Sequence, residues 1–487
     1  MGRTDDRLTR RSFLASAAVL GIAASNLSAL QAWTATPRRL PVTATPELPD
    51  IQFAISDYLS PAVTVDGVMV QYPPVYTHHL TCTLARTPTV ADQAALAAAL
   101  DTVEASYPFS ASGVFTTIAY GLPYFARLPG GVRGPLAAAT MPRLLSDPTR
   151  YALEEAVPGP TDVGGNPGQR KQRFNLPVRI EGNDLVVTVR SDTTTVLADV
   201  LAYLTGNSAT LHGSHVGNSR LGALLQPTSS RLMFVQPGLP RHLADANNLP
   251  YAGRINPASP MWMGFADQQR AGAGPPPITT FAGDRSARLT TAVAGDYFDN
   301  GAVLHLSHVI EDLAQFYADP AEPFTERVQY AFRSNPIPSV GNADQFTDGG
   351  GPAFIENTYF GADNARRDAQ GTGTYQGEHR MGHLAGLQRS SRAADGTPMH
   401  IRADGPGFDS LDIPDGSPQP KLHFAIYVPS ADFFANLRRH QASLDLVAKY
   451  HVDDSDNGFE RFITATRRQN FLVPPRRHRA FPLVELA

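Results

Sequence analysis

Residues 76–86 read YTHHLTCTLAR, and apolar and polar side chains partly alternate along them, as in a β-strand. The Ala- and Leu-rich stretch at residues 90–104 predicts a helix, and a second strand is expected near residues 114–120. This order of strand, helix and strand is typical of a sheet that is covered by helices on one face. The chain therefore opens with an α+β unit.

The same order of elements recurs later in the chain, where each predicted strand leads into a predicted helix. Apolar residues of the helix at 193–204 have helical spacing, and Ser430 is placed to cap the last of these helices. We expect two α+β halves of similar architecture, although their sequences differ too much to be called a repeat. The strand and helix pairs lie at residues 184–190 and 193–204, 303–309 and 310–317, and 421–428 and 431–446.

Composition excludes several classes of protein. Hydrophobic residues make up 42% and charged residues 18% of the 487 residues, so most of the chain is expected to fold around a core. The net charge of −4 argues against a nucleic-acid partner. Since Cys82 is the one cysteine, no intramolecular disulfide can form. The 40 glycines and 41 prolines predict long loops.

The N-terminus resembles an export signal. Residues 9–14 read TRRSFL, a twin-arginine pattern, and the apolar run at 13–24 is too short to span a bilayer. The alternative is an amphipathic N-terminal helix. We expect a signal peptide at 1–35 that is read by the twin-arginine translocation machinery, a Pro-rich linker at 36–49 and no transmembrane anchor. The mature protein would be extracellular, periplasmic or associated with the cell envelope.

The remaining chain is divided into an N-terminal half at residues 50–210, a long connection at 211–298 and a C-terminal half at 299–487. Two stretches, 205–298 and 335–382, show little regular pattern. Connections of this length within a compact domain are often functional. We therefore expect the functional site in these stretches.

Two residues stand out as candidates for chemistry. His400 lies on a short polar-flanked segment, where a fixed imidazole suits an iron ligand, although a lone histidine is more often without such a role. Asp267 follows an apolar stretch that includes Trp262 and Phe265, so we expect burial to raise its pKa, which suits a proton shuttle; the alternative is a turn or helix cap. No hydrolase elbow, phosphate loop or dinucleotide fingerprint occurs.

The other histidines and the C-terminal basic run are ambiguous. His78 and His79 are neighbours on one predicted strand, and His305 and His308 differ in parity on another, so neither pair forms a metal clamp and all four are interpreted as surface or core residues. The basic run at 467–479 would bind an anion, a haem propionate or another subunit, or form a solvated tail.

Several short blocks, in order, resemble the dye-decolorising peroxidase family. GFAD at 264–267 is similar to the start of that family's Gly-x-x-Asp-Gly motif, and MHIR at 399–402 is similar to its haem-ligand segment. Other similar blocks are DIQ at 50–52, TIAYGL at 117–122, Phe125 with LPG at 128–130, MP at 141–142, GNDLVV at 182–187 and NFLVPP at 470–475.

This resemblance implies a duplicated ferredoxin-like, dimeric α+β barrel fold with two antiparallel sheets, peripheral helices and long loops. It implies haem b in the C-terminal half, with His400 as the iron ligand and Asp267 as the acid and base that acts on hydrogen peroxide. Arg402, Gly264 and Phe265 would lie in the haem-binding segments. An organic reductant would supply the electrons, and a homo-oligomer is possible.

Two departures from the family pattern matter. Gln268 stands where the motif has glycine, so a side chain occupies a position that the family leaves open. The family's arginine beyond the haem histidine is absent between residues 409 and 437, where Lys421 is the nearest cation and is our candidate for its role. The expected function is an exported haem peroxidase; the alternatives are a non-catalytic haem- or ligand-binding protein on the same fold and a scaffold without cofactor.

Overall fold

A computed structural model describes residues 48–159, 161–162, 171–269, 274–283, 288–318, 324, 327, 353–357, 382–383, 386, 398–445 and 457–487. The predicted signal peptide lies outside these residues, and so does most of the stretch 335–382. No helix within the described ranges is long and apolar enough to cross a membrane.

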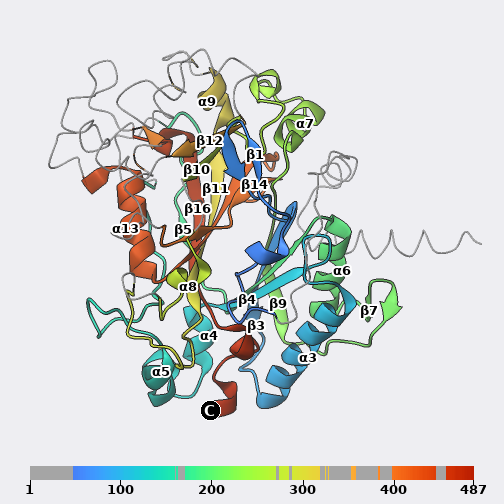
Figure 1. Cartoon of the computed structure of the whole chain (residues 1–487), viewed down its shortest axis with the longest axis vertical. Helices are drawn as coiled ribbons and strands as arrows, with labels where there is room; N and C mark the ends of the chain where they lie inside the picture. Colours follow the sequence, from blue (N-terminus) through green and yellow to red (C-terminus); the bar gives the residue numbers. More distant parts are fainter. Residues whose placement is uncertain are drawn as a thin grey trace, which may run out of the picture.

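The first half of the described chain has a ferredoxin-like βαββαβ order. Its strands pair in the order β9-β3-β6-β4, and every pairing is antiparallel. The helices α3 and α6 form the connections that follow β3 and β6 (Figure 1). The elements are β3 (Tyr76–Leu84), α3 (Val90–Ser106), β4 (Phe115–Tyr120), β6 (Leu185–Ser191), α6 (Thr194–Leu204) and β9 (Leu225–Phe234).

The second half repeats this topology. Its strands pair in the order β16-β11-β15-β14. In this order β16, β11, β15 and β14 take the places that β9, β3, β6 and β4 have in the first half. The duplication that the element order predicted is therefore confirmed. The elements are β11 (Ala302–Glu311), α9 (Leu313–Ala318), β14 (Gly405–Asp409), β15 (Gln419–Val428), α13 (Ala431–Gln441) and β16 (Ile463–Val473).

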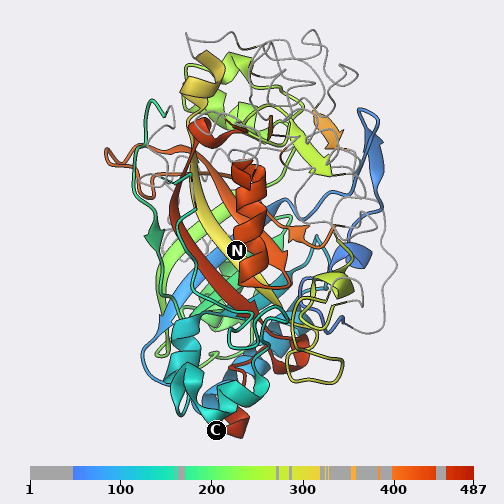
Figure 2. The ribbon, with the colours of Figure 1, turned by 90° about the vertical axis from the view of Figure 1, so that its left-hand side faces the viewer.

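The two half-sheets join into a closed barrel. β14 pairs with β9 at Gly407 and Met233, and β16 pairs with β4 at Leu472 and Tyr120. Figures 1 and 2 show the barrel with α13 against the second half-sheet, and Figure 1 shows α3 and α6 against the first. The predicted duplicated α+β barrel is confirmed, with the two sheets continuous rather than separate.

Smaller elements lie around the barrel. They are β1 (Val63–Val65), β2 (Val68–Val70), α4 (Leu122–Arg127), α5 (Pro135–Thr140), β5 (Arg179–Ile180), β7 (Thr210–Leu211), β8 (Ser214–His215), α7 (Leu239–Ala246), β10 (Ala266–Gln269), α8 (Pro276–Thr279), β12 (Phe354–Asn357) and β13 (Ile401–Arg402). β10 pairs in parallel with β12, so the GFAD segment continues into a short strand outside the barrel.

Alternation along each strand gives the barrel two faces with different roles. On β11 the even-numbered Leu304 and Leu306 pack in one core cluster with Ala425 and Phe471, inside the barrel. The odd-numbered Val303 belongs to the main core, which lies beneath the helices. Residues of the same strand therefore serve two separate environments.

Two strands of the barrel were not predicted, and some bounds differ: β11 extends to Glu311, which was expected in a helix, and α13 ends at Gln441 rather than at residue 446. β9 lies within the stretch 205–298, which was expected to be irregular. The strand was missed because its residues QPTSS lack the alternation of a strand and because Pro227 lies at a register shift opposite β3. β14 was missed because it is short and contains Gly405 and Gly407. The capping role of Ser430 is confirmed: its Oγ accepts a hydrogen bond from Phe433 N at 3.2 Å.

The C-terminal basic run is not a solvated tail. Its arginines form internal ion pairs: Arg467 with Asp412 at 2.6 Å, and Arg468 with Asp162 at 2.8 Å. Further along, Arg476 pairs with Glu104. Because β16 closes the barrel, these cations lie among the acidic groups of neighbouring segments and are neutralised there.

Candidate functional site

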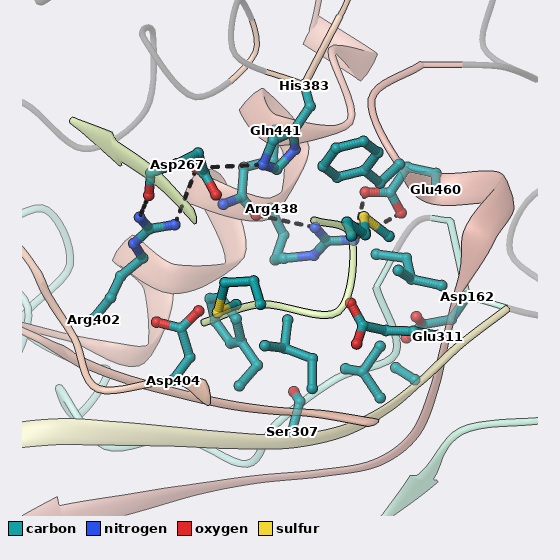
Figure 3. A pocket seen from close by; sticks show the side chains of 18 of the residues that line it. Asp162, Asp267, Ser307, Glu311, His383, Arg402, Asp404, Arg438, Gln441 and Glu460 are labelled. Atoms are coloured by element: carbon teal, nitrogen blue, oxygen red, sulfur yellow. Dashed lines mark hydrogen bonds and ion pairs between the residues drawn. The ribbon is translucent and has the colours of Figure 1, made fainter. Parts of the chain in front are cut away.

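A cavity lies against the outer face of the second half-sheet, beside α13 (Figure 3). The space within its walls and mouth amounts to about 1020 Å³.

The floor of the cavity is apolar. Every second side chain of the barrel strands points outward into the cavity. β11, β15 and β16 contribute these side chains, and the loop before β10 adds two methionines and a phenylalanine. The apolar residues are Val309, Leu422, Phe424, Ile463, Ala465, Met261, Met263 and Phe265.

One wall carries a cluster of three charged or polar side chains. Arg402 Nη2 donates a hydrogen bond to the backbone carbonyl of Asp267 at 2.6 Å, and its Nη1 lies 3.4 Å from Asp267 Oδ2. His383 Nε2 lies 3.5 Å from the same carboxylate oxygen, and its ring stacks on Phe459 with centroids 4.2 Å apart. Figure 3 shows Asp267 between the arginine and the imidazole.

This arrangement keeps Asp267 ionised. Burial alone would raise the pKa of Asp267, but the positive charge of Arg402 and the hydrogen-bonding contact with His383 outweigh burial and lower the pKa. We predicted a raised pKa here from the apolar sequence around Asp267, and that was wrong. The neighbours that reverse the direction come from β13 and from a distant segment, so the local sequence did not reveal them.

Two other carboxyl groups of the cavity behave in the opposite way. Burial raises the pKa of Glu311 to about 8, with a further contribution from the charge of Asp404. Burial also raises the pKa of Asp404, although Arg402 opposes the shift. The cavity therefore holds an ionised carboxylate and a carboxyl group that stays protonated at neutral pH. Groups with separated pKa values of this kind are typical of sites that move protons.

The opposite wall is built from closed ion pairs. Arg438 on α13 lies 2.9 Å from Glu460, and Arg468 pairs with Asp162. Lys171 also lines this wall, and burial lowers its pKa against the opposing charges of Glu460 and Asp162.

The structure brings some of the predicted site residues together and separates others. Asp267, Arg402 and Phe265 all line the cavity. Gly264 precedes them with φ +90°, a conformation that favours glycine, and a Cβ there would lie 3.1 Å from the hydroxyl of Tyr317. His400 is buried, but it is not among the described residues that line the cavity.

The assignment of Lys421 to the arginine's role is wrong. Leu422 and Phe424 line the cavity, so Lys421, one position along the same strand, points into the barrel. There its Nζ donates a hydrogen bond to Leu411 O at 2.8 Å and lies 3.8 Å from Asp409. In the sequence, Lys421 is the cation nearest to the position of the family's arginine. On the strand, however, alternation places Lys421 on the face of the sheet opposite the cavity.

Sequence reasoning also missed several residues of the cavity. His383 lies in a Gly-rich stretch without an interpretable pattern, and Glu311 was placed in a predicted helix although β11 continues through it. Arg438 lies on α13, and helical spacing predicts which residues of this helix share a face with it. Helical spacing does not predict which other segments that face contacts.

The lining of the cavity suits haem in composition. The apolar floor matches a porphyrin ring, and the guanidinium groups of Arg402 and Arg438 match propionates. The imidazole that lines the cavity in the described residues is His383. The cavity therefore fits the group, with an imidazole other than the one predicted.

A protein-family model described as a family of unknown function (DUF7405) matches residues 150–475, well over half of the chain. The chain belongs to this family. The match to the DUF7405 model covers the last strands of the first half and nearly all of the second, including every residue of the cavity described above. No curated protein matches.

Among solved structures, this DUF7405 member is similar to dye-decolorising peroxidases at low identity. A putative DyP-type peroxidase from Shewanella oneidensis is 13% identical with a TM-score of 0.46, over 83% of this chain and 94% of that one. The encapsulated DyP-type peroxidase from Mycobacterium smegmatis is 12% identical with a TM-score of 0.45, over 83% and 94%. A DyP-type peroxidase from Cellulomonas bogoriensis is 15% identical with a TM-score of 0.44, over 86% and 95%. The fold assignment for DUF7405 rests on the strand order rather than on these likenesses.

Proposed function

We propose that this protein is an exported, haem-binding oxidoreductase with peroxidase-like function, which reduces hydrogen peroxide with an organic electron donor. The observation that carries the proposal is the convergence of Asp267, Arg402 and His383 over an apolar floor. A carboxylate, a guanidinium and an imidazole in one partly enclosed cavity supply the groups that acid–base chemistry beside a haem requires.

Bound haem would supply the redox chemistry. The residues of the chain would bind the group and move protons beside it. The Asp267 carboxylate is ionised and accepts a proton from a substrate that enters the cavity, while Arg402 holds this carboxylate in place through its backbone and side-chain contacts. The apolar floor limits the access of water to the cavity.

Two observations favour a second candidate function, non-catalytic binding of haem or another flat ligand. The low pKa of Asp267 makes it a weak base, and Lys421, the predicted replacement for the missing arginine, points into the barrel. Within the described residues, the positive charges that line the cavity belong to Lys171, Arg402, Arg438 and Arg468, and the last three are in ion pairs. A site of this kind binds a ligand without promoting cleavage of a peroxide bond.

The binding half of the proposal is tested by haem loading. The mature protein is incubated with hemin, freed of excess ligand, and examined for a Soret band and for one haem per chain. His383→Ala and His400→Ala are compared with His478→Ala, which removes a histidine that lies at the C-terminal 3-10 turn, away from the cavity lining. Loss of the Soret band in one of the first two variants alone identifies the axial ligand. A wild-type protein that takes up no haem overturns the proposal.

The catalytic half is tested on the loaded protein. Hydrogen peroxide is added under stopped flow, and the spectrum of an oxidised haem intermediate is sought in the wild type and in Asp267→Asn. Peroxidase-like function predicts a rapid change that slows by about 10²- to 10⁴-fold in the variant. Haem binding without any spectral change on addition of peroxide selects the second candidate function.

The export route, the homo-oligomer and the identity of the reductant remain predictions from the sequence and the resemblance. The twin-arginine pattern at residues 9–14 supports export of a protein that is already folded.

A further inference from the structure

The interior of the barrel contains a second group of chemically active side chains, separate from the cavity. His308 on β11 and His423 on β15 are directly opposite each other in the antiparallel register. Asp409, the last residue of β14, reaches the same place. Their neighbours Val309, Leu422 and Phe424 line the outer cavity, so the three side chains point to the opposite face of the sheet.

Both imidazoles lie farther from Asp409 than the ~2.7–3.2 Å of an ordinary N–H···O hydrogen bond. His308 Nε2 lies 3.5 Å from Asp409 Oδ1, and His423 Nε2 lies 3.4 Å from Asp409 Oδ2. Both histidines are completely buried, and neither Nε2 atom has a hydrogen-bond partner in the described structure. Buried polar atoms are nearly always satisfied, so two such atoms aimed at one carboxylate require an explanation.

A metal ion accounts for this spacing. Nitrogen and oxygen ligands that bind one tetrahedral ion at 2.0–2.2 Å lie about 3.3–3.5 Å from each other. The two imidazole nitrogens lie 3.5 Å from Oδ1 and 3.4 Å from Oδ2 of Asp409, so each approaches a different carboxylate oxygen. One ligand atom from each of His308, Asp409 and His423 can be chosen so that all three lie within 4.8 Å of one another, close enough for a single ion to draw them into one coordination sphere.

The contacts of His308 support the same conclusion. Its Nδ1 lies 2.8 Å from Thr466 Oγ1, and this hydroxyl lies 2.8 Å from Asp412 Oδ2. Because the carboxylate can only accept, the threonine hydroxyl donates to it and accepts the proton of His308 Nδ1. The lone pair of Nε2 then faces Asp409, and a cation between them removes the repulsion between two acceptors.

Gly407 provides the space for this arrangement. A Cβ at this position would lie 2.4 Å from His423 Nε2 and 2.6 Å from its Cδ2, so any other residue would displace the ring. Asp409 and Asp412 are partly exposed, with side-chain exposures of 12% and 21%, whereas both histidines are fully buried. Lys421 is the competing cation, with its Nζ 3.8 Å from Asp409 Oδ1.

We propose that His308, Asp409 and His423 form a binding site for a first-row divalent transition metal ion such as Zn²⁺, Co²⁺ or Fe²⁺ inside the barrel. Two imidazoles and one carboxylate suit these ions and not Ca²⁺ or Mg²⁺, which prefer oxygen ligands. Three protein ligands leave a coordination position for water or a small ligand, which is the pattern of catalytic rather than structural metal sites. The proposal does not depend on what binds in the outer cavity.

The test uses the mature protein, without an affinity tag and after treatment with a chelator. Isothermal titration with Zn²⁺ and the visible absorption of added Co²⁺ both report the site, and one ion per chain is expected. His423→Gln and Asp409→Asn remove a ligand and are expected to weaken binding by more than about 100-fold, while Thr466→Val, which alters only the support of His308, weakens it by about 10- to 100-fold. Lys421→Met is expected to strengthen binding, because it removes the competing charge.

The matched control is His305→Gln. This residue is also buried on β11, but its Nδ1 and Nε2 contact Asn470 at 2.7 Å and Ser307 at 2.6 Å, so it is not available as a ligand. Circular dichroism verifies that each variant is folded. If a ligand variant does not fold, the effect of Lys421→Met still decides. Absence of saturable binding to the folded wild type overturns the proposal, and so does equal binding by the wild type and a folded Asp409→Asn.

Discussion

Arg402 contacts Asp267 twice, through a hydrogen bond of 2.6 Å to its backbone carbonyl and an approach of 3.4 Å to its carboxylate. The two residues come from β13 and β10, so this pair joins the long connection at 211–298 to the segment that precedes β14. It also determines the protonation state of the only carboxylate in the cavity that contacts an imidazole in the described residues.

We therefore predict that Arg402→Met raises the pKa of Asp267. Burial would then act without the opposing guanidinium, and His383 alone would favour the ionised form. The variant is also expected to lose about 1–3 kcal/mol of unfolding free energy, because a hydrogen bond from a charged group is removed. Carbon-detected NMR titration of the Asp267 carboxyl group measures the shift. Arg439→Met, which removes a cation from α13 without altering the cavity lining, is the control.

Glu311 predicts a dependence of stability on pH. Its folded pKa of about 8 exceeds its value of about 4.5 in the unfolded chain, so the folded state binds more protons between these two values. Stability contributed by Glu311 is therefore complete below pH 4.5 and is lost as the pH rises toward 8. Glu311→Gln removes this loss, and the variant should exceed the wild type by on the order of 3–5 kcal/mol at pH 8.

The measurement for Glu311 is urea denaturation of both proteins at several pH values from 4.5 to 8.5. Because other titrating groups are common to the two proteins, the difference between their unfolding free energies isolates Glu311. A difference that does not change with pH would show that this carboxyl group has an ordinary pKa.

The pair of Asp162 and Arg468 predicts a large effect on stability. Both side chains are 4% exposed, and Arg468 also donates a hydrogen bond to Ser307 Oγ at 3.0 Å. Arg468→Met leaves a buried carboxylate without its partner and is expected to cost about 3–5 kcal/mol. The double variant Asp162→Asn/Arg468→Met should recover part of this loss, as measured by chemical denaturation. Additive effects would contradict the buried pair.

The acidic partner of this pair gives a second, opposite pH effect. Burial would raise the pKa of Asp162, but Arg468 outweighs it and lowers the pKa. The contribution of this group is therefore present above its unfolded pKa and disappears as the pH falls through the lower, folded value. In Arg468→Met burial acts with less opposition and the folded pKa of Asp162 rises, so acidification from pH 5 to pH 3 should destabilise the variant less than the wild type, which thermal melts over this range would detect.

The export prediction is tested by a conservative change in the N-terminal segment. Arg10→Lys with Arg11→Lys keeps the positive charge but removes the paired guanidinium groups that the twin-arginine pathway recognises. We expect the variant to accumulate inside the cell with its N-terminus intact, and the wild type to appear outside the cytoplasm after cleavage near Ala32 or Ala35. Mass spectrometry of the N-terminal peptide distinguishes the two. Equal export of both would contradict the prediction.

The sequence by itself determined features that depend on near neighbours. The alternation in β3, the apolar spacing of α6 and the cap at Ser430 are local, and each predicted the element that the structure contains. The order of these elements was enough to predict a duplicated α+β fold, because helices that follow strands pack on the face of the sheet that those strands form.

Only the tertiary structure decided which side chains meet. Strand parity places Lys421 inside the barrel and Leu422 outside it, and pairing between β11, β15 and β14 brings His308, His423 and Asp409 together from positions up to 115 residues apart. The low pKa of Asp267 likewise depends on Arg402, 135 residues further along the chain. Hydrophobic pattern is local, whereas these contacts are set by the register of strands that pair across long sequence separations, which no single segment encodes.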